Sequence, residues 1–225
     1  ARLKTLLAAI SPVCMGSALS LHEGTLNVMI FLMTLLASIL IQIGTNFAND
    51  VFDFQKGADR EDRLGPLRMT QSGLISPQKM KYGMWFVFML ATGVGFYLFS
   101  IGGFPIIVIG LASMISGVLY TGGPYPLGYH GWGDVFVFIF FGLIAVPGTY
   151  YLQSGNVSMD SIWMGVSMGM LSNAILVVNN LRDMDSDKIS GKRTLAVRFG
   201  RYFSKVQYSL LILIPFYLPF YFWLK

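Results

Sequence analysis

Two short clusters of acidic and amide side chains stand out in a sequence that is otherwise poor in charge. The first cluster has spacings of three, four and seven residues and consists of Asn46, Asn49, Asp50 and Asp53. The second has spacings of three and seven and consists of Asn180, Asp183 and Asp187. On a continuous helix, such spacings place the side chains of each cluster on one face. Each cluster is therefore predicted to present oxygen ligands on one side of a helix.

Two carboxylate clusters that face one cavity repel each other unless cations lie between them. Mg²⁺ suits such hard oxygen ligands, because it is typically held by one or two carboxylates together with substrate phosphates. Basic residues near both clusters could bind the phosphate oxygens that the metal leaves free. They are Lys56, Arg63, Arg68, Lys188, Lys192 and Arg193. The combination predicts a Mg²⁺-dependent site for a diphosphate.

The elements that must position these residues are hydrophobic. Of the 225 residues, 54% are hydrophobic and 12% are charged, about half the charged fraction of a soluble domain. Uncharged blocks cover residues 5–22, 24–49, 82–133, 135–159, 161–181 and 206–224. A bilayer span needs roughly 20 apolar residues, and the block 82–133 is long enough for two spans with a turn at 102–105.

The sequence therefore predicts an all-α, polytopic membrane helix bundle, which excludes an ordinary soluble enzyme. Its seven transmembrane helices are expected at 5–21, 26–52, 82–101, 104–121, 135–152, 161–184 and 204–224. We expect a single domain, 1–225, in which the loops 53–81 and 185–204 carry the acidic motifs. The spacing of Gly165 and Gly169 predicts a close contact between two helices.

Basic residues are concentrated on one side of this predicted bundle. Fifteen of the 16 Lys and Arg residues precede the first span or follow the second and sixth spans. By the positive-inside bias, the N-terminus and both long loops are expected in the cytoplasm, and the membrane is expected to be the cell inner membrane. The formal charge of +5 thus belongs to one face of a lipid bilayer, and no nucleic-acid partner is expected.

The two acidic motifs resemble those of the UbiA superfamily of intramembrane prenyltransferases. Residues 49–59 read Asn-Asp-Val-Phe-Asp-Phe-Gln-Lys-Gly-Ala-Asp, and residues 179–187 read Asn-Asn-Leu-Arg-Asp-Met-Asp-Ser-Asp. The broad family pattern has a third acid four residues after Asp53, where this chain has Gly57. Residues 56–59 read Lys-Gly-Ala-Asp, which resembles the Lys-Gly-x-Asp variant of the naphthoquinone branch of the family. The stretches 65–73, 120–128 and 191–196 also resemble that branch.

This resemblance implies a reaction and a set of site residues. A polyprenyl group would pass from polyprenyl diphosphate to an aromatic acid acceptor, 1,4-dihydroxy-2-naphthoate, with decarboxylation, giving demethylmenaquinol and pyrophosphate. The Mg²⁺ ligands would be Asn49, Asp50, Asp53, Asn180, Asp183 and Asp187. Substrate would be bound by Lys56, Arg63, Arg68, Lys192, Arg193 and Tyr125. The catalytic residues would be Asp53, Asp183, Asp187 and Tyr120. Family members usually have nine helices, so two C-terminal helices are expected to be missing from this chain.

Other functions fit parts of the sequence. If the aromatic acceptor is 4-hydroxybenzoate, the chain is a related prenyltransferase. An intramembrane cation carrier could also use paired acids, although carriers usually place them near the bilayer midplane beside broken helices. Here the acids lie at helix ends among many bases. The length of the isoprenoid, the identity of any catalytic base and the oligomeric state are not predicted.

Overall fold

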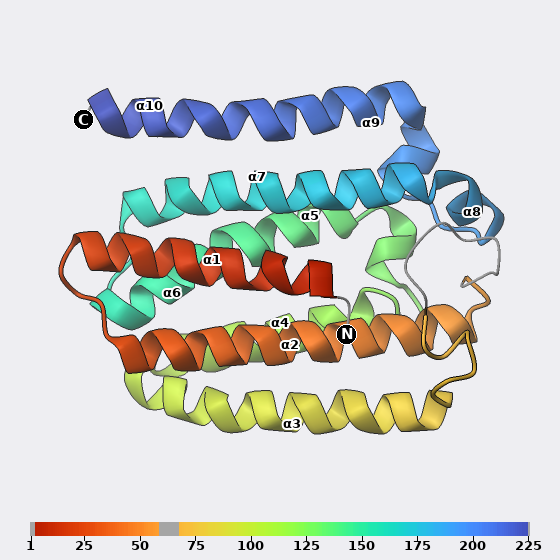
Figure 1. Ribbon diagram of the computed structural model, residues 1–225, viewed down its shortest axis with the longest axis horizontal. Coiled ribbons are helices and arrows are strands. Elements are labelled where there is room, and N and C mark those ends of the chain that lie inside the picture. The colour runs from red at the N-terminus through yellow and green to blue at the C-terminus, as the bar shows by residue number, and fades with distance from the viewer. Residues whose placement is uncertain (1–2, 59–67, 225) are drawn as a thin grey trace.

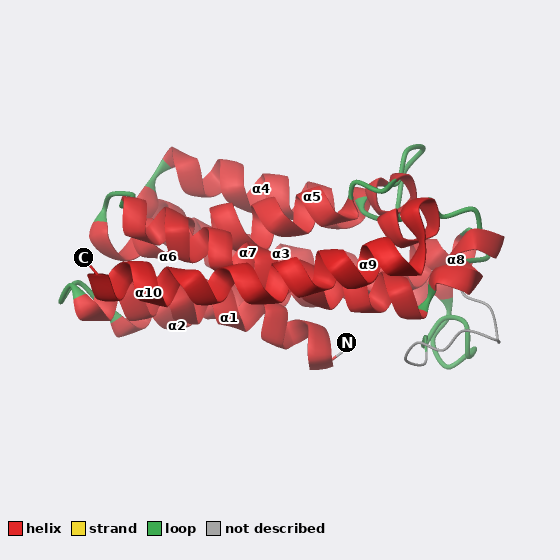
Figure 2. Ribbon diagram, turned by 90° about the horizontal axis from the view of Figure 1, so that it is seen from above, coloured by secondary structure: helices red, strands yellow, loops and turns green. Residues whose placement is uncertain are grey.

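The computed structural model describes residues 3–58 and 68–224. These residues form helices and loops without a strand, so the all-α prediction is confirmed for them. The longer helices run side by side along one direction (Figures 1 and 2). Their bounds are α1 Leu3–His22, α2 Val28–Gln55, α3 Pro77–Gly102, α4 Phe104–Leu119, α5 Gly133–Val137, α6 Ala145–Ser154, α7 Met159–Arg182, α8 Met184–Ile189, α9 Leu195–Leu213 and α10 Tyr217–Leu224. Two short 3₁₀-helices, η1 Leu127–His130 and η3 Ile214–Phe216, and a π-helix, η2 Phe138–Ile144, complete the described helices.

Local sequence explains where several helices begin. The side chain of Asn27 accepts hydrogen bonds from the amides of Met29 and Ile30 at the start of α2. Ser76 caps α3 and is followed by proline, which suits the first helical position. Gly103 has φ 66° between α3 and α4, a conformation that favours glycine. The predicted turn at 102–105 is therefore present.

The predicted count of seven spans is not confirmed. Within the described residues, five helices are long and apolar enough to cross a membrane: Thr5–His22, Val28–Gln55, Pro77–Gly102, Gly133–Ser154 and Met159–Arg182. The span predicted at 104–121 is a shorter apolar helix, Phe104–Leu119. The span predicted at 204–224 is divided among α9, η3 and α10. Proline at position 215 lies in η3, and it cannot donate a backbone hydrogen bond to an α-helix.

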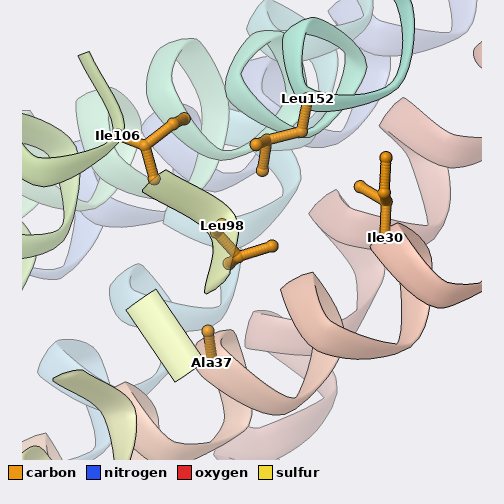
Figure 3. Packing of buried hydrophobic residues seen from close by; sticks show 5 residues of the cluster. All are labelled: Ile30, Ala37, Leu98, Ile106 and Leu152. Carbon is orange, nitrogen blue, oxygen red and sulfur yellow. The ribbon is translucent and has the colours of Figure 1, made fainter. Parts of the chain in front are cut away.

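The bundle packs through both bulky and very small residues. Ile30 and Ala37 of α2 form a buried cluster with Leu98, Ile106 and Leu152 from α3, α4 and α6 (Figure 3). Elsewhere, glycine allows backbones to meet. A Cβ added to Gly142 would lie 2.5 Å from the carbonyl oxygen of Gly165 and 2.7 Å from Cα of Gly169. The close helix contact predicted at Gly165 and Gly169 is thus confirmed.

The connections divide between the two ends of the bundle. The α1–α2, α3–α4 and α6–α7 connections lie at one end (left in Figure 1). The C-terminal end of α2, the C-terminal end of α7, α8 and the start of α9 lie at the other end. Both acidic motifs therefore reach the same end of the molecule.

Candidate active site

A cavity of about 650 Å³ lies inside the bundle. Its walls are largely apolar and include Phe96, Phe99, Leu111, Phe136, Phe140 and Phe141. Polar side chains from both acidic motifs line it as well, namely Asn46, Asn49, Asp53, Asn179, Asn180, Asp183 and Asp187. Basic and hydroxyl groups join them, namely Arg68, Tyr120, Thr121, Tyr129, Arg182 and Lys192. The two motifs thus share one cavity, as the sequence predicted.

Asp53, the last acid of the first motif on α2, is buried with 2% of its surface exposed. Its Oδ2 lies 2.6 Å from Nη2 of Arg68, a side chain that is equally buried. Its Oδ1 accepts a hydrogen bond of 2.9 Å from the hydroxyl of Tyr129. A buried carboxylate is tolerated when charge and hydrogen bonds compensate for the lost water. Both carboxylate oxygens of Asp53 are compensated in this way.

The second motif lies where α7 ends and α8 begins. Asp183 is buried and receives two hydrogen bonds of 2.7 Å from Nε and Nη2 of the adjacent Arg182. Asp187 on α8 is also buried. The ammonium of Lys192 lies 3.4 Å from Oδ1 of Asp53 and 3.8 Å from Oδ1 of Asp187. One positive group therefore lies between carboxylates of the two motifs.

The donor set suits a divalent cation that arrives with a diphosphate. The carboxylates of Asp53 and Asp187 already share a cation, Lys192, and the amides of Asn49 and Asn180 line the same cavity. The described residues contain no cluster of three His, Cys, Asp or Glu side chains that could hold a metal alone. Mg²⁺ does not need one, because phosphate and water oxygens usually complete its coordination. The residues present therefore fit Mg²⁺.

Asp50 does not face this cavity with the other acids. Its carboxylate accepts hydrogen bonds from the backbone amides of Met69, at 3.2 Å, and Thr70, at 3.0 Å. These hydrogen bonds hold the backbone at Met69 and Thr70 against α2. Asp50 thus makes a structural contact in this arrangement, and its predicted contact with a metal stays a prediction.

The other predicted site residues that the structure describes differ in position, because Tyr120 lines the cavity whereas Lys56, Arg193 and Tyr125 do not. Nζ of Lys56 donates to the carbonyl of Gly123 at 3.2 Å. Burial is the main cause that lowers the pKa of Lys56 from 10.5. The attraction of Asp53 opposes this shift, and the repulsion of Lys192 adds to it. Arg193 has an exposed side chain.

Tyr125 is 55% exposed and stacks on the ring of His130 at 3.7 Å. Tyr120 does line the cavity. It packs closely on the start of α5, where a Cβ on Gly133 would lie 2.7 Å from the Tyr120 hydroxyl. Arg63 lies outside the described residues.

Two residues at the site were missed in the sequence. Arg182 directly precedes Asp183, so adjacency alone could have indicated it. Tyr129 lies 76 residues from Asp53 along the chain, and no spacing pattern connects the two. Its aromatic neighbours in the 120–132 loop gave no reason to prefer it over Tyr120 or Tyr125.

The fold and the cavity define an intramembrane enzyme class, and the chain belongs to the UbiA prenyltransferase family, whose family model matches residues 9–225. It is thus a prenyltransferase and a multi-pass membrane protein. A 1,4-dihydroxy-2-naphthoate octaprenyltransferase of Haemophilus influenzae is 40% identical over 220 residues, covering 94% of this chain and 71% of the relative. The Escherichia coli protein with the same name is 38% identical over 207 residues, covering 88% of this chain and 67% of the relative.

A solved structure of a digeranylgeranylglyceryl phosphate synthase has a TM-score of 0.61 to this chain. It is 18% identical, and the match covers 97% of this chain and 75% of the other. At this identity the likeness supports the fold alone.

Proposed function

We propose that this chain transfers a polyprenyl group from polyprenyl diphosphate to 1,4-dihydroxy-2-naphthoate. The acceptor loses its carboxylate as CO₂, and the products are demethylmenaquinol and pyrophosphate. The relatives named as naphthoate octaprenyltransferases support this acceptor. The observation that carries the proposal is that Asp53 and Asp187 share the Lys192 cation at one wall of an apolar cavity.

The diphosphate would bind at the polar wall of the cavity. Asn49, Asp53, Asn180, Asp183 and Asp187 are the oxygen donors there that would hold Mg²⁺. Mg²⁺, when bound, would neutralise the negative charge that develops on the departing diphosphate. UbiA prenyltransferases are generally metal-dependent, and the choice of Mg²⁺ rests on the carboxylate and amide oxygens of the polar wall, where the described lining residues include no Cys or His.

The basic residues at the same wall would bind the diphosphate oxygens directly. Arg68 and Lys192 line the cavity and already contact Asp53. Arg182 lines it beside Asp183. Because these charges are fixed before the reaction, they would stabilise the leaving group without reorganisation. Lys56 and Arg193 would assist them, and the sequence predicts the same role for Arg63.

The C–O bond of the allylic diphosphate would break toward an allylic cation, with both bonding electrons leaving on pyrophosphate. The apolar walls would hold the isoprenoid tail and exclude water that could trap the cation. Tyr120 lines the cavity, and its ring could stabilise the cation. The electron-rich naphthoate ring would then attack the cation and lose CO₂.

The site end of the bundle is proposed to face the cytoplasm, with the chain in the cell inner membrane. The basic residues after α2 and α7 support this orientation by the positive-inside bias. The lipid substrate could then reach the cavity from the bilayer, and the polar acceptor from the cytoplasm.

A competition assay tests the proposed acceptor. The full chain would be purified in detergent and supplied with Mg²⁺ and octaprenyl diphosphate, together with equal amounts of 1,4-dihydroxy-2-naphthoate and 4-hydroxybenzoate. We expect a prenylated naphthoquinol and release of CO₂, identified by mass spectrometry. Prenylated 4-hydroxybenzoate as the main product would overturn the acceptor assignment. Proteoliposomes with cation flux that is independent of lipid diphosphate, and with no transfer, would instead favour the carrier.

A further inference from the structure

Tyr129 connects parts of the site that are far apart in sequence. It lies in η1, within the loop after α4, and its hydroxyl donates to Oδ1 of Asp53 at 2.9 Å. The ammonium of Lys56 lies 5.0 Å from the centroid of its ring, and that of Lys192 lies 4.8 Å from the same centroid. The side chain thus touches a carboxylate of the first motif and one lysine from each basic segment.

These contacts explain how like charges can gather beside one carboxylate. The ammonium groups of Lys56 and Lys192 repel each other, and this repulsion is one of the causes that lower the pKa of Lys56. The negative face of an aromatic ring attracts a cation within about 6 Å of its centroid. The ring of Tyr129 meets this condition for both lysines. It therefore offsets part of their repulsion and restricts where they lie.

The backbone around Tyr129 is held in place by the second half of the molecule. The carbonyl of Tyr129 accepts a hydrogen bond of 2.8 Å from the amide of Arg193. Nη2 of Arg198 donates to the carbonyl of His130 at 2.9 Å. Gly131 follows with φ 79° and lies so close to Arg193 that a Cβ would be 2.9 Å from its carbonyl oxygen. The α8–α9 connection and the first turn of α9 thus fix the position from which Tyr129 reaches Asp53.

We infer that Tyr129 is a positioning residue, whose hydroxyl orients Asp53 for the divalent cation and whose ring holds Lys56 and Lys192 for the diphosphate. This inference rests on the proposed function, because it assumes that Mg²⁺ and a diphosphate bind at this wall. A hydrogen-bond donor that orients a ligating carboxylate acts on metal affinity through that ligand. The hydroxyl acts on the divalent cation and the ring acts on the diphosphate, so substitutions of Tyr129 can separate the two roles.

The test uses purified full chain, Mg²⁺ and inorganic pyrophosphate, with calorimetric titration as the readout. Y129F removes the hydroxyl and keeps the ring, whereas Y129L removes both. Y82F is the matched control, because Tyr82 is a 74% exposed tyrosine on α3. Thermal unfolding of each variant verifies that the protein is folded.

For Y129F, we expect the Mg²⁺ concentration for half-saturation to rise about 10- to 100-fold, with pyrophosphate affinity at saturating Mg²⁺ close to wild type. For Y129L, we expect pyrophosphate affinity at saturating Mg²⁺ to fall as well, by about 3- to 30-fold. Y82F should match wild type in both titrations. Wild-type Mg²⁺ affinity in Y129F overturns the role of the hydroxyl, and equal pyrophosphate affinity in Y129F and Y129L overturns the role of the ring.

These titrations do not use the aromatic acceptor, so the positioning role of Tyr129 and the proposed function can be contradicted separately. If the variants differ as expected but wild-type protein does not prenylate the naphthoate, the proposed function is wrong and the positioning by Tyr129 stands. If wild-type protein prenylates the naphthoate while Y129F binds Mg²⁺ normally, the inference is wrong and the proposed function stands.

Discussion

The two acidic motifs look alike in sequence, but the structure supports them differently. Asp53 in the first motif is held by Arg68, 15 residues away, and by Tyr129, 76 residues away. Asp183 in the second motif is held by its immediate neighbour, Arg182. The Asp53–Arg68 pair therefore joins residues from α2 and a separate loop, whereas the Asp183–Arg182 pair joins two adjacent residues at the end of α7.

The difference extends to solvent exposure. The side chains of Arg68 and Asp53 are each 3% exposed, whereas that of Arg182 is 34% exposed. Losing one partner of a buried ion pair leaves an uncompensated charge, but a partly exposed partner can be solvated by water. Equivalent substitutions in the two motifs should thus have equal effects on catalysis and unequal effects on stability.

The largest effect is expected for Asp53→Asn and Asp183→Asn. Each should reduce prenyl transfer by at least about a hundredfold, because each removes a charge from the proposed diphosphate site. Asp53→Asn should also lower the free energy of unfolding by about 3–5 kcal/mol, because Arg68 loses its buried carboxylate partner. Asp183→Asn should lower it by less, because the side chain of Arg182 is 34% exposed and can be solvated when its partner charge is lost.

Prenyl transfer assays and denaturant unfolding in detergent measure these two quantities. Arg68→Met combined with Asp53→Asn is the control, since removing both charges should recover part of the lost stability. Wild-type turnover in either single variant contradicts the proposed site. Equal losses of stability in the two variants contradict the contrast between the motifs.

A smaller effect is expected for Asp50, which belongs to the first motif but not to the cavity wall. Asp50→Ala should lower the free energy of unfolding by about 1–3 kcal/mol, because the partly buried amide of Met69 and the buried amide of Thr70 lose their acceptor. Asp50→Asn keeps one oxygen acceptor and should lose less. The Mg²⁺ concentration for half-maximal activity should match wild type in both variants. A several-fold rise in that concentration would show that Asp50 binds the metal after all.

The contrast between the motifs also explains what the sequence could predict. Helical spacing and the uncharged blocks predicted the five long spans and the turn at Gly103. Together with the distribution of basic residues, they also predicted that both motifs lie at one end of the bundle. These features depend on local periodicity and on the length that a membrane requires. The number of spans was harder to predict from the sequence, because it depends on where a proline or the packing of neighbouring helices interrupts an apolar stretch.

Residue contacts across the cavity were the hardest part to predict. Asp50 and Asp53 are equally acidic and only three residues apart, yet one binds backbone amides and the other faces the cavity. Tyr120, Tyr125 and Tyr129 share one loop, and only the conformation of that loop brings Tyr129 to Asp53. Such choices are made by tertiary packing, which leaves no period in the sequence.

A modest pH effect should distinguish Lys56 in the first motif. Burial is the main cause that lowers its pKa from 10.5, with Lys192 acting in the same direction and Asp53 opposing both. Lys56 therefore loses its proton at a lower pH than an ordinary lysine, and KM for the diphosphate should rise a few-fold within the alkaline range below 10.5.

The same shift has a consequence for stability with a definite sign. In this pH range the unfolded chain binds more protons at Lys56 than the folded chain does, so the contribution of Lys56 to stability should increase as pH rises. Lys56→Arg keeps its charge throughout the range and should remove the rise in KM. An unchanged KM profile in that variant would assign the alkaline effect to another group.

The smallest effect is expected within the second motif, at Asp185. This acid lies between Asp183 and Asp187 in sequence, but its side chain is 78% exposed and pairs with the exposed Arg201 at 2.8 Å. Exposed ion pairs contribute little, so Asp185→Ala should change the free energy of unfolding by less than about 1 kcal/mol. Prenyl transfer and its Mg²⁺ dependence should stay at wild-type levels. A large loss of activity with unchanged stability would mean that the second motif uses all three of its acids, and that its exposed acid turns inward when substrate binds.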